Sequence, residues 1–161
     1  MVSDFSNIGP FIRFMKMFSV AVALETGHDV LFQDLDVTWL SNPMAELQAK
    51  RDFFHAQFQD DNSRQERFAP YFANTGFFYL TSVPRTRWFW EQVMTSIPNY
   101  PQGNQYVLSG VLELFTRRWE FKTRILPIEV YQSGAYLSHP TKTPARIRFK
   151  PIFPEAKVQR L

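Results

Sequence analysis

Short apolar runs and helical patterns alternate along this chain, and this alternation constrains the fold more than any other feature. Apolar residues in Phe11–Leu24 recur at the spacing of one helix face. Gly27 suits the end of that helix, and the apolar run His28–Gln33 after it is typical of a buried strand in a parallel sheet. Similar patterns predict helices at Met44–Lys50, Pro84–Ile97 and around Leu108–Phe115, and strands at Phe77–Leu80 and Trp119–Leu126. A half-buried strand is predicted at Phe54–Phe58, because its apolar residues alternate with the polar His55 and Gln57. The order helix, strand, helix, strand, strand, helix, helix, strand predicts a single α/β domain over residues 1–161.

The composition agrees with a packed globular domain. Hydrophobic residues make up 45% of the 161 positions, charged residues 20% and aromatic residues 17%. These values exclude a disordered chain and favour an aromatic core with a cleft that can stack ring-shaped ligands. There is no cysteine, so a disulfide framework and thiolate chemistry are both excluded.

Positive charge is concentrated at the C-terminal end of the chain. The net charge is +3, and the proline-containing segment 140–161 supplies the basic excess, while the rest of the chain is slightly acidic. Such a segment suits either a phosphate-bearing partner or a solvated tail. Basic and aromatic residues do not interleave on any predicted sheet face, so no nucleic-acid partner is expected.

No apolar stretch is long enough to span a membrane, so no membrane segment is expected. The longest candidate, Phe11–Leu24, is interrupted by Arg13 and Lys16. It also lacks the basic start and cleavage site of a signal peptide. The sequence therefore predicts a soluble chain without a visible targeting signal.

Two carboxylates one residue apart, Asp34 and Asp36, follow the predicted strand His28–Gln33. Ligands of open α/β sheets bind just outside the carboxyl ends of strands. In an extended segment both side chains would point to one face, about 7 Å apart. Their oxygens suit a hard divalent cation that bridges a diphosphate, whereas the simpler alternative is a pair of solvated carboxylates.

The triplet Asn74-Thr75-Gly76 precedes the predicted strand Phe77–Leu80. Gly76 allows the backbone to approach a ligand closely, and Asn74 offers a donor and an acceptor to sugar hydroxyl groups. The alternative interpretation is an ordinary turn before a strand.

Two ordered segments resemble the nucleotide-diphospho-sugar transferase family. The segment His28–Pro43 is similar to the metal-binding motif of that family, which includes plant and algal cell-wall xylosyl- and arabinosyltransferases. The second block consists of Phe58–Asp61 and Arg67–Tyr79 at a compatible spacing. The likeness runs from about Lys16 to Ser109, with weaker similarity as far as His139.

The resemblance implies a GT-A fold, which is a Rossmann-like mixed sheet flanked by helices. It implies a nucleotide-sugar donor such as a UDP-sugar, a glycan or glycoprotein acceptor, Mn²⁺ or Mg²⁺ as cofactor, and retention of anomeric configuration. Asp34 would contact the donor ribose or sugar and is also a candidate metal ligand, and Asp36 would hold the metal. Full-length relatives would be found in the Golgi lumen or associated with its membrane.

Three more positions have roles implied by the same resemblance. Asn104-Gln105 stands where the family usually has Asp-Gln or His-Gln. Gln105 can still bind a hydroxyl group, and Asn104 is predicted as a plain helix cap. His139 is a candidate third metal ligand, although a surface histidine is the simpler interpretation. Lys150 could contact the diphosphate as a point charge.

Only 33 residues precede Asp34, fewer than the strand-helix-strand segment of the family requires. The chain is therefore expected to lack part of the N-terminal nucleotide-binding half. A second hypothesis follows, in which the same fold is a non-catalytic carbohydrate- or partner-binding remnant.

Overall fold

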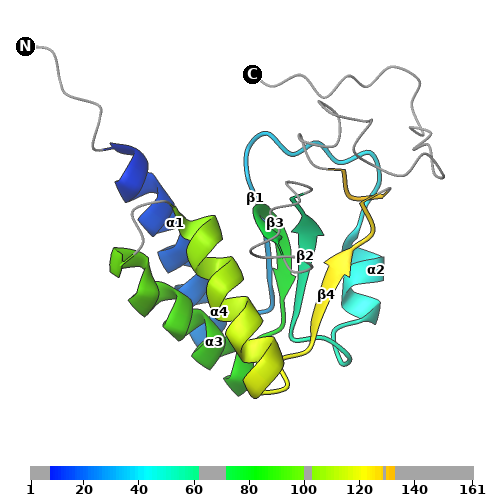
Figure 1. Cartoon of the computed structure of the whole chain (residues 1–161). Helices are drawn as coiled ribbons and strands as arrows, with labels where there is room; N and C mark the ends of the chain where they lie inside the picture. The colour runs from blue at the N-terminus through cyan, green and yellow to red at the C-terminus, as the bar shows by residue number, and fades with distance from the viewer. Residues whose placement is uncertain (1–7, 62–71, 100–102, 129, 133–161) are drawn as a thin grey trace, which may run out of the picture.

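The computed structural model describes residues 8–61, 72–99, 103–128 and 130–132. The predicted helices and strands are all present and follow one another in the predicted order (Figure 1). The helices are α1 (Ile8–Glu25), α2 (Met44–Ala49), α3 (Pro84–Ser96) and α4 (Asn104–Arg118), with the short 3-10 helix η3 (Ile97–Asn99) after α3. The strands are β1 (Val30–Gln33), β2 (Ala56–Asp60), β3 (Ala73–Leu80) and β4 (Thr123–Leu126).

The strands form a four-stranded mixed sheet in the order β1-β3-β2-β4. Strand β3 is antiparallel to both of its neighbours, and β2 is parallel to β4. The fold is therefore α/β with a mixed sheet, as predicted. The expectation that β1 is a buried strand of a parallel sheet is wrong, because β1 pairs antiparallel with β3 and its residues are half-buried or exposed.

Helices cover both faces of the sheet and give a three-layer arrangement (Figure 1). On one face, α1, α3 and α4 pack around Phe58, Phe78 and Leu80. On the other face, Leu47 of α2 packs with Phe77 and Tyr79. Because successive residues of a strand point to opposite faces, the continuous apolar run of β3 fills both layers of the core.

Aromatic rings fill the larger of the two layers. Trp90 and Phe78 have ring centroids 5.4 Å apart, and Phe89 stacks on Phe121 at 4.5 Å. Trp88 lies at the rim, where its ring contacts Phe115. The aromatic-rich composition is thus used mainly in packing between the sheet and its helices.

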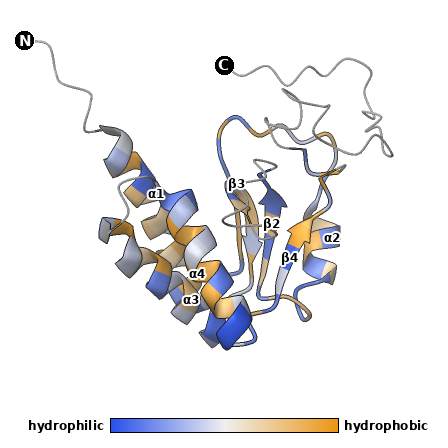
Figure 2. Ribbon diagram, viewed as in Figure 1, coloured by the Kyte–Doolittle hydropathy of each residue, from blue (hydrophilic) through white to orange (hydrophobic). Residues whose placement is uncertain are grey.

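Helix α1 is held by its second half. Met17 and Leu24 are buried there, and the indole N–H of Trp90 donates to the carbonyl of Met17 at 2.9 Å. The first turns extend beyond the sheet and carry exposed hydrophobic residues, among them Phe11 and Ile12 (Figures 1 and 2). Within the described ranges, no helix combines the length and the hydropathy needed to cross a bilayer.

Strand β2 is buried on both faces, although its sequence alternates between apolar and polar residues. Gln57 is fully buried because α2 covers its face of the sheet, and its amide donates to the carbonyl of Leu47 at 2.8 Å. The strand predicted at Phe54–Phe58 extends instead from Ala56 to Asp60. It is buried where a half-buried strand was predicted, and its polar Gln57 finds a hydrogen-bond partner inside the protein.

Candidate functional site

Three strands end at the same edge of the sheet. β1, β2 and β4 run in one direction, so their carboxyl ends lie together, and β3 begins at that edge because it runs the opposite way. The connection after β1 arches over this edge, which we call the site edge (Figure 1). Ligands of α/β proteins bind outside the carboxyl ends of strands, so the site edge is the natural position for a ligand.

Asp34 and Gly76 meet at the site edge. The backbone N–H of Asp34 donates to the carbonyl of Gly76 at 2.8 Å, which extends the β1–β3 pairing by one residue. A Cβ atom at position 76 would lie 3.1 Å from Asp34 Oδ2 and 2.9 Å from Asn74 Oδ1. A side chain at position 76 would therefore displace Asn74 and Asp34, whose polar ends lie against the backbone of the glycine.

Asn74 is ordered by the same glycine. The N–H of Gly76 donates to Asn74 Oδ1 at 2.6 Å, which leaves the Nδ2 group of Asn74 as the part that can donate to a ligand. Thr75 lies between them and is only 6% exposed. These residues belong to β3, so the alternative of an ordinary turn before the strand is wrong.

The two carboxylates do not lie on an extended segment. After β1 the chain turns, and the N–H of Val37 donates to the carbonyl of Asp34 at 3.3 Å. Leu35 and Asp36 are exposed within this turn. The expectation of a common strand face for Asp34 and Asp36 is therefore wrong, because the tight turn replaces the extended geometry on which it rested.

Lys16 is a site residue that the sequence patterns did not indicate. Its Nζ lies 2.7 Å from Asp34 Oδ1, and the Lys16 side chain is 14% exposed. The same ammonium group lies 4.8 Å from the centroid of Phe32. One indication of this role is present in the sequence, which is a basic residue within the apolar pattern of α1. A solvated side chain would explain that residue equally well.

The start of α4 also lies near the site edge. Tyr106 of its first turn contacts Phe72, just before β3, with ring centroids 6.0 Å apart. Gln105 belongs to the same helical turn and is half-buried. Asn104 is not the predicted helix cap: Gly103 occupies that position with φ +122°, and no side chain caps the helix.

The remaining predicted site residues, His139 and Lys150, lie outside the described residues. Within the described ranges, no group of three or more histidine, aspartate or glutamate side chains is placed to hold a metal ion. Asp34 and Asp36 are thus the carboxylates that the described part of the chain brings to the turn after β1.

A hollow of about 270 Å³ opens beside this turn. The segment from Val37 to Pro43 forms one wall, and Glu46, Gln59 and Tyr131 line the rest. Trp39, which also lines it, is exposed. The hollow combines a carboxylate, an amide and aromatic rings, which are the groups that bind sugar rings and their hydroxyls.

Glu46 is fixed by two partners from the far end of the chain. Arg124 Nη2 donates to its Oε1 at 2.6 Å, and the Tyr131 hydroxyl donates to its Oε2 at 2.8 Å. Burial raises the pKa of Glu46, but the hydrogen bonds from Tyr131 and Arg124 outweigh it and hold the pKa below its usual value. Burial and the bond to Glu46 raise the pKa of Tyr131, so its hydroxyl remains a donor at neutral pH.

A comparison with protein families assigns the chain to a family. The nucleotide-diphospho-sugar transferase family matches residues 13–159, which is most of the chain. The chain belongs to this family. No curated protein and no solved structure gives a significant match. A transferase that takes a sugar from a nucleotide-sugar donor is the activity that membership of this family supports.

Proposed function

We propose that this protein transfers a sugar from a nucleotide-diphosphate sugar, a UDP-sugar by expectation, to a glycan or glycoprotein acceptor, with retention of configuration. The observation that carries the proposal is the meeting of Asp34, Asn74 and Gly76 at the site edge, in a chain of this family.

The chemistry of the two carboxylates fits Mn²⁺ or Mg²⁺. Asp36 is exposed, and no hydrogen bond or ion pair engages its side chain within the described residues. Mg²⁺ is commonly held by one or two carboxylates together with substrate phosphates, so a site without a third protein ligand is compatible with it. Asp36 would be the main ligand, Asp34 a second one, and His139 a further candidate that suits Mn²⁺.

The polar residues of the site edge would orient the donor. A bound cation would neutralise the diphosphate leaving group as the glycosidic bond breaks. Asp34, held by Lys16, would accept hydrogen bonds from hydroxyls of the donor ribose or sugar. Asn74 and Gln105 would bind sugar hydroxyls, and Lys150 would contact the diphosphate.

We assign the acceptor to the 270 Å³ hollow beside the turn. Its position next to Asp36 would put an acceptor hydroxyl near the donor sugar. Trp39 and Tyr131 offer ring faces to a sugar, and Glu46 offers a fixed acceptor for hydroxyl protons.

Thermal unfolding with UDP and Mn²⁺ tests donor binding. Saturating ligand should stabilise the protein by about 2.7 kcal/mol at a hundredfold excess over the dissociation constant. Asp36→Ala should keep the fold, since the side chain is exposed, and should abolish the part of the shift that requires Mn²⁺. Glu91→Ala removes an exposed carboxylate of α3, away from the site edge, and should respond like the unmodified protein.

A binding domain without turnover is the second candidate. The ion pair that neutralises Asp34 with Lys16 favours it, because it lowers the charge available to a metal. A thermal shift with a glycan, without any shift with UDP and Mn²⁺, would support this second candidate, a carbohydrate-binding remnant of the same fold. No shift with any nucleoside diphosphate would refute donor binding and with it the proposed transferase activity.

A further inference from the structure

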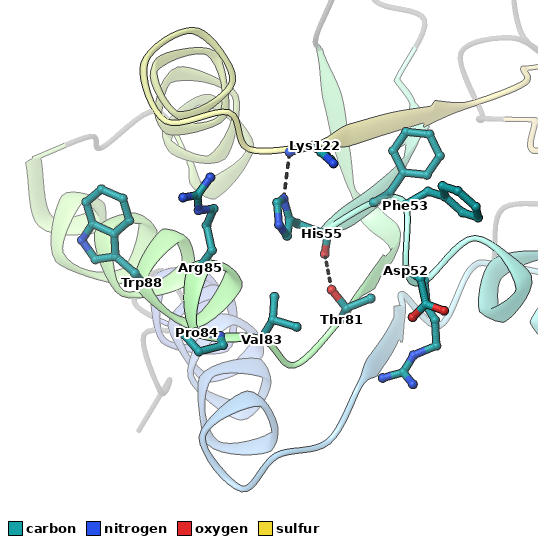
Figure 3. A pocket seen from close by; sticks show the side chains of 11 residues that line it. Asp52, Phe53, His55, Thr81, Val83, Pro84, Arg85, Trp88 and Lys122 are labelled. Atoms are coloured by element: carbon teal, nitrogen blue, oxygen red, sulfur yellow. Dashed lines mark hydrogen bonds between the residues drawn. The ribbon is translucent and has the colours of Figure 1, made fainter.

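A second and larger hollow lies at the edge of the sheet opposite to the site edge. Its volume is about 650 Å³, within the range of small-molecule sites. The segment from Arg51 to His55 forms one wall, the link between β3 and α3 forms another, and Lys122 stands before β4 (Figure 3). β2 and β4 begin here and β3 ends here, so this hollow shares no residue with the site edge.

Positive charge exceeds negative charge around this hollow. Arg51, Arg85 and Lys122 line it, against the single carboxylate of Asp52. Arg51 is already balanced by Asp29, whose Oδ2 accepts from its Nε at 3.0 Å. Arg85 donates to the carbonyl of Trp119 at 2.7 Å, and no carboxylate of the described residues forms an ion pair with it. Within the described residues, no ion pair engages Lys122 either.

His55 adds a neutral donor between these cations. The backbone N–H of Lys122 donates to His55 Nδ1 at 2.8 Å, so in the neutral ring the proton is on Nε2. The ring stacks on Phe121 with centroids 5.0 Å apart, which fixes its orientation. Figure 3 shows it between the backbone of Lys122 and the side chain of Arg85. Burial and the nearby charges of Arg85 and Lys122 lower the pKa of His55, which favours the neutral ring.

The rest of the lining suits a ligand with an organic part. Phe53 is exposed and lines the hollow together with Val83 and Pro84 at the start of α3. The first turn of α3 contains no acidic residue, so the positive end of the helix dipole adds to the charge of Arg85. The cations, the imidazole N–H and the helix dipole therefore all favour the same kind of group.

We propose that this hollow binds a ligand that carries a phosphate or carboxylate group, held by Arg85, Lys122 and His55 Nε2–H, with a ring-shaped part against Phe53. Sugar phosphates and uronic acids share this chemistry. The inference does not rest on the proposed transfer reaction, because no residue of the site edge takes part.

Calorimetric titration of the full chain with glucose 1-phosphate, glucuronate and inorganic phosphate tests the proposal. We expect saturable binding of at least one of the two sugar ligands, with a smaller affinity for inorganic phosphate. Lys122→Gln removes an exposed charge and should weaken binding about tenfold, as loss of one charge-assisted hydrogen bond does. Arg85→Gln should have a similar effect, and Asp52→Asn should strengthen binding because it removes the opposing charge.

Matched controls separate this site from general electrostatics and from the donor site. Arg118→Gln removes one exposed positive charge from the last turn of α4 and should leave affinity unchanged. Asp34→Asn should also leave it unchanged. Tighter binding of glucose 1-phosphate would identify the anionic group as a phosphate, and tighter binding of glucuronate would identify it as a carboxylate. If inorganic phosphate bound as tightly as the sugar ligands, the proposed contact between Phe53 and a ring-shaped part of the ligand would be refuted. No binding of any probe, or equal losses in Lys122→Gln and Arg118→Gln, would overturn the proposal.

Discussion

The ammonium group of Lys16 lies 2.7 Å from the carboxylate of Asp34, in a contact that joins α1 to the turn after β1. Lys16 is also 4.8 Å from the Phe32 ring centroid, so charge and ring together fix its side chain. The position of Asp34 therefore depends on a helix residue that lies 18 positions earlier in the chain. The carboxylate that precedes the exposed Asp36 is held in place before any ligand arrives.

Replacing Lys16 with methionine tests whether this contact orients Asp34. The change keeps most of the apolar stem but removes the ion pair, so stability should fall by about 1 kcal/mol or less. Affinity for UDP with Mn²⁺ should change more than stability does, because Asp34 loses its orientation. Chemical denaturation and ligand titration measure the two effects. Equal donor affinity in Lys16→Met and the unmodified protein would show that the ion pair serves the fold alone.

Gly76→Ala should disrupt the site edge. The new Cβ would lie 2.9 Å from Asn74 Oδ1 and 3.1 Å from Asp34 Oδ2, so both side chains must move. Donor affinity should fall, while the strand itself loses little stability. Gly110→Ala is the matched control, because nothing lies within 4 Å of its Cβ position in α4. That control should stabilise the protein by about 0.5–1 kcal/mol and leave ligand binding unchanged.

Acid should weaken the link between β1 and β3 through Asp29. Burial raises the pKa of Asp29, but hydrogen bonds from the Ser82 N–H, the Tyr79 hydroxyl and Arg51 hold the pKa below its usual value. Burial and the hydrogen bond to Asp29 raise the pKa of Tyr79 to about 12. A carboxyl group with a lowered folded-state pKa stabilises the protein above about pH 4, its unfolded value. That stability is lost as the pH falls further. Unfolding free energies measured from pH 6 to pH 2 should show this loss, and Asp29→Asn should reduce it.

His55 predicts a second pH dependence at a milder pH. Burial and the charges of Arg85 and Lys122 lower the pKa of His55 in the folded state, so the unfolded chain binds the proton more tightly. The resulting stability is complete above about pH 6.5, the unfolded value, and decreases as the pH falls toward the folded-state pKa. His55→Asn retains an acceptor for the Lys122 N–H and should reduce the slope between about pH 6.5 and pH 5. An unchanged slope would contradict the assignment to His55.

Local patterns in the sequence predicted the elements and part of the site. Asp34, Asn74 and Gly76 stand beside predicted strands, and the structure brings these three together. The direction of β1 was not predictable, because an apolar run is compatible with parallel and antiparallel pairing. Gln57 was expected on an open face, and only the docking of α2 shows why it is buried.

The contacts that were missed join residues far apart along the chain. Glu46 meets Arg124 and Tyr131 across 78 and 85 positions, and no local pattern indicates such pairs. Lys16 lies within an apolar helix pattern, which is equally compatible with a solvated side chain and with one paired to Asp34. Side-chain pairing between distant segments depends on how the helices dock on the sheet, which periodicity does not encode.

Among the described strands, β1 lies at one edge of the sheet, where it pairs with β3 alone, and it is four residues long. A short outer strand can detach locally at a lower free energy than the central strands β3 and β2. Such an opening would carry Asp34 and Asp36 away together and leave the aromatic core intact. Amide hydrogen exchange along β1 would then report how often the site edge comes apart, and a bound donor should slow that exchange first at Asp34.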